Sequence, residues 1–120
     1  MRIAICDDDP IELQNISTFI EEYFKSKNLP FNCKSFSSST ELANTASGEF
    51  DLYLLDVLMP ALNGIELAKE IRSFDRAAHI IFLTSSPEFA VESYSVKASN
   101  YLLKPVSTEL LAASLDELLE

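Results

Sequence analysis

Short apolar runs alternate along the chain with longer segments whose apolar residues recur at helical spacing. Short continuous apolar runs are typical of strands buried on both faces. They lie at residues 2–6, 31–36, 51–56, 79–84 and 99–103. Apolar residues at the three-and-four spacing of one helix face occur at Ile16, Phe19, Ile20, Tyr23 and Phe24, and again at Leu111, Leu115 and Leu118. The pattern predicts five β/α units.

Capping residues mark where the predicted helices begin. Asp9 precedes Pro10 and Glu12, which fits an N-cap, a proline at the first helical position and a carboxylate that reaches back to the cap. The later starts are marked by Ser38 with Glu41, Asn63 with Glu66, Ser86 before Pro87, and Ser107. With 120 residues the chain has the length of one domain. Right-handed crossovers then favour an α/β fold with a doubly wound, five-stranded parallel sheet in the order 2-1-3-4-5.

Each of four predicted strands ends on polar residues suited to phosphoryl chemistry. Asp7 and Asp8 follow the first strand, Asp56 ends the third, Thr84 ends the fourth and Lys104 follows the fifth. The carboxyl ends of parallel strands share one edge, where open α/β sheets bind ligands. We therefore expect these side chains to converge.

Three carboxylates at one edge would repel each other unless a cation lies between them. Oxygen-only ligands suit Mg²⁺, and with one histidine in the chain and no cysteine at this edge a zinc site is implausible. A metal that bridges a carboxylate and a phosphoryl group makes that carboxylate a feasible nucleophile, and Asp56, which ends the central strand, is the candidate. Lys104 can neutralise phosphoryl oxygens, and Thr84 can donate a hydrogen bond to one.

Composition and charge argue against a nucleic-acid-binding, secreted or membrane-spanning chain. The net charge of −10 argues against a nucleic-acid contact by this chain, because such contacts rest on Lys and Arg. Cys6 and Cys33 lie in apolar runs and are interpreted as free, buried thiols of a reducing cytosol. No apolar run is long enough for a signal peptide or a membrane span. We expect a soluble, cytoplasmic protein without a membrane contact.

The same residues allow simpler structural interpretations, and three other functions are alternatives to a phosphoryl-accepting site. Asp9 is best explained as a helix cap, whereas one helix does not need Asp7 and Asp8 as caps too. A phosphatase of the haloacid dehalogenase type needs a second acid two residues after its nucleophile, where this chain has Leu58. A flavodoxin-like FMN binder needs a phosphate loop rich in Ser, Thr and Gly after the first strand, where this chain is acidic. A module of the same fold that never uses phosphate is the third rival.

Four motifs carry a family resemblance over the whole chain: IAICDDDP, DLYLLDVLMPALNGIELAKEIR, IIFLTSS and NYLLKP. In this order and spacing the chain resembles the receiver domain of bacterial two-component response regulators. The segment PEFAVESYSVKASNYLLKP is further similar to receivers of LytTR-type transcriptional regulators. The resemblance implies the flavodoxin-like fold and a phosphoacceptor signalling domain, not an enzyme acting on a separate substrate.

The resemblance also implies a role for each site residue. Asp56 would accept a phosphoryl group from the histidine of a sensor kinase, with Lys104 binding the phosphate. Asp8 and Asp56 would ligate Mg²⁺ directly, Asp7 through water, and the Leu58 backbone carbonyl would complete the protein ligands; Mn²⁺ could substitute. Thr84 and Tyr101 would form the switch pair, and the Lys104–Pro105 peptide bond would be cis. Leu58 and Ala61 depart from the polar residue and the glycine that are frequent at their positions.

The resemblance further implies that phosphorylation remodels the face of the fourth helix, fifth strand and fifth helix, and that this face forms a homodimer. Candidate apolar residues of this face, each of which could equally be core, are Phe89, Val91, Tyr94 and Val96. We expect residues 1–120 to be one receiver domain. Because the chain stops within or just after its last predicted helix, we expect a DNA-binding output domain to be missing from it, a stand-alone receiver being the alternative.

Overall fold

The computed structural model describes residues 1–45 and 48–119, and the predicted boundary residue 120 lies outside this range. Five strands alternate with helical segments as predicted. The strands are β1 (Arg2–Cys6), β2 (Asn32–Phe36), β3 (Leu52–Leu55), β4 (His79–Thr84) and β5 (Asn100–Leu103). The helices are α1 (Pro10–Ser26), α2 (Ser39–Thr45), α3 (Gly64–Phe74), α4 (Ala90–Ser93) and α5 (Thr108–Leu119), with 3₁₀ turns η1 (Pro87–Phe89) and η2 (Tyr94–Val96) on either side of α4.

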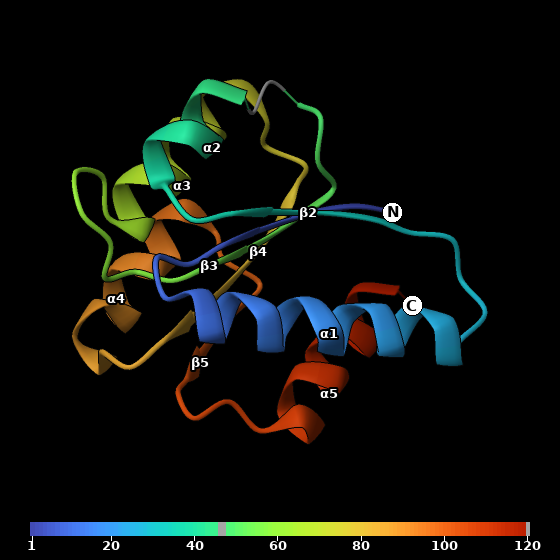
Figure 1. Ribbon diagram of the computed structural model, residues 1–120. Coiled ribbons are helices and arrows are strands. Elements are labelled where there is room, and N and C mark those ends of the chain that lie inside the picture. The colour runs from blue at the N-terminus through green and yellow to red at the C-terminus, as the bar shows by residue number, and fades with distance from the viewer. Residues whose placement is uncertain (46–47, 120) are drawn as a thin grey trace.

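The strands form one parallel sheet in the predicted order β2-β1-β3-β4-β5. Helices α1 and α5 cover one face of this sheet, and α2 and α3 cover the other (Figure 1). The register pairs Cys6 with Leu55, the last residues of β1 and β3. The residues that follow these two strands therefore start side by side at one edge.

Each face of the sheet has its own apolar core, because alternate strand residues point to opposite sides. Ile3, Ile5 and Leu54 pack with α1 and α5, whereas Tyr53 and Leu55 pack with α2 and α3. β1, β3 and β4 are flanked by a strand on both sides, and all four residues of β3 are buried. This burial explains why their sequences are continuous apolar runs instead of alternating ones.

The predicted caps hold at most helix starts. Asp9 accepts a hydrogen bond from the Ile11 N–H, and Asn63 forms a reciprocal capping box with Glu66. The Asp9 N–H donates to Asp7 Oδ1 at 3.0 Å, so Asp7 takes the place that we predicted for Glu12.

The fourth helical segment differs most from the sequence expectation. Ser86 gives no side-chain cap, and the α-helical part is only four residues long, between two 3₁₀ turns. The candidate surface residues divide: Val91 and Tyr94 are 80% and 83% exposed, Phe89 is half-buried, and Val96 is in the core at 2%. Three of these four side chains are thus accessible to solvent on or beside α4.

Candidate phosphoacceptor site

Of the predicted site residues, Asp7, Asp8, Asp56 and Lys104 meet at the carboxyl-terminal edge of the sheet, where Thr84 ends β4. Backbone hydrogen bonds continue the strand pairing just beyond the strand ends. The Asp56 N–H donates to the Cys6 carbonyl at 3.0 Å, and the Lys104 N–H donates to the Thr84 carbonyl at 2.8 Å. These bonds fix the backbone from which the site side chains start.

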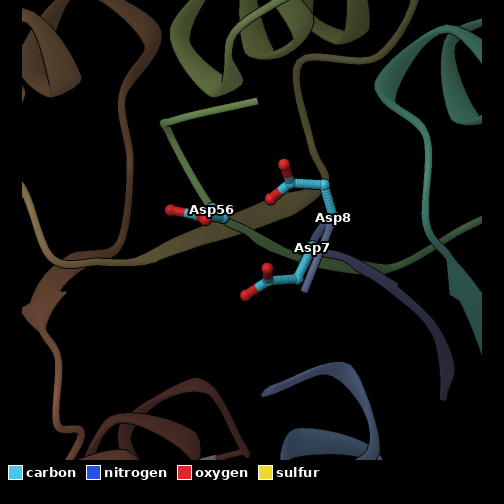
Figure 2. A group of neighbouring side chains, drawn as sticks. All are labelled: Asp7, Asp8 and Asp56. Carbon is cyan, nitrogen blue, oxygen red and sulfur yellow. The ribbon is translucent and has the colours of Figure 1, made fainter. Parts of the chain in front are cut away.

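Three carboxylates form a compact cluster at this edge. Asp7, Asp8 and Asp56 each place one oxygen so that the three atoms lie within 4.8 Å of one another. Figure 2 shows the three side chains on the ends of two neighbouring strands. Asp7 is 1% exposed and Asp56 is 7% exposed, whereas Asp8 is open to solvent. The buried pair and the exposed third acid make the cluster accessible from one side.

Lys104 lies against the two buried acids. Its Nζ is 2.7 Å from Asp7 Oδ2 and 3.5 Å from Asp56 Oδ2. Burial lowers the pKa of Lys104, but the hydrogen bond to Asp7 and the charges of Asp56 and Asp7 outweigh burial, so the pKa lies above its ordinary value. The ammonium group therefore stays charged and offsets part of the repulsion in the cluster. The Lys104–Pro105 peptide bond is cis, as expected.

The loop after Asp56 is held close to α3 by Gly64. The Gly64 N–H donates to the Val57 carbonyl at 2.8 Å, and a Cβ on Gly64 would lie only 2.2 Å from the Asp56 carbonyl oxygen. Only glycine permits this approach. Our sequence reasoning missed Gly64, although one of only two glycines, placed just after the cap residue Asn63, was a usable signal.

Two residues of the same loop depart from the family pattern. Ala61 has φ +66°, in the left-handed region that favours glycine. Leu58 is 48% exposed, and its N–H donates to Asp56 Oδ1 at 3.4 Å. An apolar side chain is thus exposed two residues after Asp56, the acid that follows β3.

Thr84 and Tyr101 both reach Ser86. Thr84 is fully buried, and its Oγ1 accepts a hydrogen bond of 3.3 Å from the Ser86 N–H. The Tyr101 hydroxyl donates to the Ser86 carbonyl. The pKa of Tyr101 is raised, chiefly by burial. Ser86, for which the sequence predicts only a cap, is the backbone link between the two predicted switch residues.

The donor set fits a hard divalent cation. All side-chain ligands in the cluster are carboxylate oxygens, which Mg²⁺ prefers, and one side of the cluster is open for water and phosphate oxygens. The position of the Leu58 carbonyl in such a site stays a prediction.

Comparisons with known proteins identify the family of this chain. The family model for the response regulator receiver domain matches residues 3–116. The chain is a member of the response regulator receiver family. It is 35% identical over 115 residues to the sensory transduction protein LytR of Staphylococcus epidermidis, with 91% of this chain and 42% of that protein covered. It is 30% identical over 115 residues to the positive alginate biosynthesis regulatory protein of Pseudomonas aeruginosa, with 96% and 46% covered.

A solved structure confirms the fold. The response regulatory domain of protein MrkE from Klebsiella pneumoniae superposes with a TM-score of 0.87 at 26% identity, covering 98% of this chain and 93% of that one. The predicted resemblance to LytTR-type receivers is confirmed by the relatives, the first of which is itself a LytR protein. This receiver domain spans less than half of the length of these two curated relatives. Within the described residues, the helices are too short or too polar to cross a bilayer.

Proposed function

We propose that Asp56 accepts a phosphoryl group from a phosphorylated histidine of a sensor kinase. The observation that supports this role is the placement of Asp56 beside two further acids and Lys104 at one edge of the sheet. A carboxylate oxygen of Asp56 attacks the phosphorus atom, a P–O bond forms, and the P–N bond breaks. The electron pair of that bond stays on the histidine nitrogen.

Mg²⁺, for which Mn²⁺ could substitute, would be held by Asp7, Asp8, Asp56 and the Leu58 carbonyl. When bound, it supplies charge neutralisation between the carboxylates and the phosphoryl oxygens. Lys104 provides a second positive charge for those oxygens, and the Thr84 hydroxyl donates a hydrogen bond to one of them. The domain thereby promotes its own phosphorylation and dephosphorylation.

The Ser86 backbone couples the switch residues in this proposal. When Thr84 turns toward the phosphoryl group, its Oγ1 leaves the Ser86 N–H, which is now 3.3 Å away. The same residue's carbonyl accepts from the Tyr101 hydroxyl, so a shift of the Ser86 backbone changes the position of Tyr101. Tyr101 lies on β5, next to α4 and α5, and its movement alters the face made by these elements.

Dimerisation through this face is the proposed readout. Large apolar side chains on its elements are exposed to solvent: Val91 80%, Tyr94 83%, Leu103 50% and Leu110 58%. Burial of such side chains between two copies stabilises a dimer. In a longer regulator, the dimer would pair two output domains that bind DNA and control transcription. The relative from Pseudomonas aeruginosa is named as a regulatory protein, which supports a regulatory output. The acidic receiver itself would not contact DNA.

The kinase is proposed to dock on the α1 side of the acid cluster. Ile11, in the first turn of α1, is 72% exposed. A hollow of about 200 Å³ lies between α1 and the loop after β5, with Phe19, Pro105 and Val106 in its lining. An apolar helix face of the kinase would fit there and present its histidine to Asp56.

We further propose that residues 1–120 make up the receiver domain. A cytoplasmic location stays a prediction.

Phosphorylation by acetyl phosphate with Mg²⁺, followed by intact-protein mass spectrometry, tests the acceptor. Asp56→Asn should take up no phosphate. Asp9→Asn is the matched control, because it makes the same chemical change two residues from Asp7 and asparagine caps helices as well as aspartate does. Continued phosphate uptake by Asp56→Asn would remove Asp56 from its role, and the absence of Mg²⁺ binding at millimolar concentration would favour a module that does not use phosphate.

Light scattering after size-exclusion chromatography tests the dimer. With Mg²⁺ and beryllofluoride the molar mass should double, and in Val91→Glu it should stay that of a monomer. Lys25→Glu on α1 is an exposed-site control that should still dimerise. An unchanged mass of the unsubstituted chain at high concentration would contradict the dimer model.

A further inference from the structure

Three cationic side chains line one hollow at the edge of the sheet opposite to the acid cluster. Arg72 lies in the last turn of α3, Arg76 follows α3, and Lys97 follows η2. Together with Ser95 and Val96 they line a hollow of about 210 Å³. The hollow lies between the segments that lead into β4 and β5, so the length of these strands separates it from Asp56.

This concentration of positive charge is unusual for the chain. The chain has only nine Lys and Arg residues and nineteen Asp and Glu residues, yet three of the nine basic residues line this one hollow. Over residues 1–45 and 48–119, the ion pairs with carboxylates involve Arg2, Lys27 and Lys104 and none of the three. Asp75, the acid between the two arginines, is engaged by the Ala77 and Ala78 N–H groups at 3.0 and 3.1 Å. The positive charge at the hollow is therefore not neutralised by an ion pair within the described chain.

Arg72 is held rigidly by neutral groups. It donates to the carbonyls of Val96 and Ala78 at 2.7 Å each, of Lys97 at 3.2 Å and of Asp75 at 3.3 Å. These bonds fix the guanidinium plane without cancelling its charge. Burial lowers the pKa of Arg72, and the nearby charge of Asp75 offsets only part of this effect.

Lys97 occupies a backbone conformation that disfavours lysine. Its φ is +54°, in the left-handed region, where glycine or asparagine would be easier to accommodate. Lys97 is the C-cap of η2, and its N–H donates to the Tyr94 carbonyl at 3.1 Å, as is common where a helix ends on a left-handed residue. This turn places a lysine beside the fixed guanidinium of Arg72, whose Nη2 donates to the Lys97 carbonyl.

We propose that Arg72, Arg76 and Lys97 form a binding site for the phosphate group of a small phosphate monoester. The guanidinium fork of Arg76 matches phosphate oxygens, whereas Arg72 has one N–H left for them, because its four hydrogen bonds use the others. Up to three positive charges suit a group with nearly two negative ones. The hollow is smaller than the roughly 300–1,000 Å³ of sites for drug-sized ligands, which favours a small ester over a nucleotide. Nucleic acid is disfavoured by the net charge of −10.

Titration of the ¹⁵N-labelled chain by NMR tests this site. The probes are inorganic phosphate and glycerol phosphate, in EDTA so that metal does not recruit them to the acid cluster, and at an ionic strength held constant with sodium chloride. We expect saturable shifts of the amides at residues 72–76 and 95–97. The glycerol ester should bind at least as tightly as inorganic phosphate if an ester is the ligand.

Charge-matched variants separate the site from a bulk charge effect. Arg76→Gln with Lys97→Gln should weaken binding by about tenfold or more, because two charge-assisted contacts are lost. Lys25→Gln with Lys34→Gln removes the same charge from exposed positions on α1 and β2 and should bind like the unsubstituted chain. Arg72 is kept because its four hydrogen bonds are structural. Equal weakening in both double variants, or the same shifts with chloride alone, would overturn the site.

Discussion

The Lys104 ammonium donates a hydrogen bond of 2.7 Å to Asp7, a residue 97 positions away in the sequence. The same nitrogen is 3.5 Å from Asp56, so one cation bridges the two buried acids of the receiver site. Part of the negative charge that would attract a metal is thus already balanced by the chain itself.

Lys104→Gln should therefore bind Mg²⁺ more tightly. Loss of a unit positive charge close to the carboxylates deepens their negative potential, and we expect an increase in affinity of about tenfold, within the range of a Coulomb interaction at this separation. Isothermal titration calorimetry with Mg²⁺ measures it. Lys34→Gln, on the opposite edge strand β2, should leave the affinity unchanged. Weaker Mg²⁺ binding in Lys104→Gln would mean that Lys104 orders the ligands more than it repels the ion.

Gly64→Ala should destabilise the domain, although alanine usually strengthens a helix. Its Cβ would lie 2.2 Å from the Asp56 carbonyl oxygen and 2.8 Å from the Val57 Cα, both backbone atoms. We expect a loss of about 3 kcal/mol in the free energy of unfolding, measured by urea denaturation, and reduced phosphorylation of the displaced Asp56.

Gly48→Ala is the comparison variant for Gly64→Ala. Gly48 has φ +75° but nothing within 4 Å of an added Cβ. Gly48→Ala should lower the free energy of unfolding by only about 1 kcal/mol, because only backbone strain is added, and phosphorylation should be unaffected. Equal losses at both positions would show that the Asp56 loop moves away without cost.

Ala61→Gly should stabilise the domain. At φ +66° the alanine Cβ is strained, and glycine removes the strain at the cost of a more flexible unfolded chain. The net gain in the free energy of unfolding should be about 0.5 kcal/mol, again from urea denaturation. Ala43→Gly, within α2, is the opposite control and should destabilise by about 1 kcal/mol. A loss of stability in Ala61→Gly would show that the loop tolerates the left-handed alanine.

Alkaline pH should weaken the fold through its thiols. Burial raises the pKa of Cys33 to about 11 and that of Cys6 to about 12, with nearby acids adding to the shift at both. Because the folded-state pKa is the higher one, the thiols favour the folded state fully below pH 9, and this contribution is lost as the pH rises toward 11 to 12. The free energy of unfolding should fall over that window.

Cys33→Ser measures the thiol contribution. Its free energy of unfolding should fall less steeply above pH 9 than that of the unsubstituted chain, with thermal melts at each pH as the readout. Alkylation with iodoacetamide, followed by mass spectrometry, should reach the half-buried Cys33 before Cys6, which is 1% exposed. Faster labelling of Cys6 would contradict its burial.

The sequence by itself determined the sheet and the gathering of acids and a lysine at one of its edges. The buried central strands can only be continuous apolar runs, and the polar residues that end them must share one edge once the crossovers are right-handed. The sequence therefore places Asp7, Asp56, Thr84 and Lys104 at the same edge.

Only the tertiary structure decided the contacts that depend on approach between distant backbones. The need for glycine at position 64 arises from the Asp56 carbonyl, and the link of Thr84 to Tyr101 arises from the Ser86 backbone. The burial of Val96 and the gathering of Arg72, Arg76 and Lys97 likewise depend on how the segment before β5 packs on the end of α3. Local hydrophobic periodicity does not predict such contacts, because they join segments that are far apart in the chain and meet only when the helices pack on the sheet.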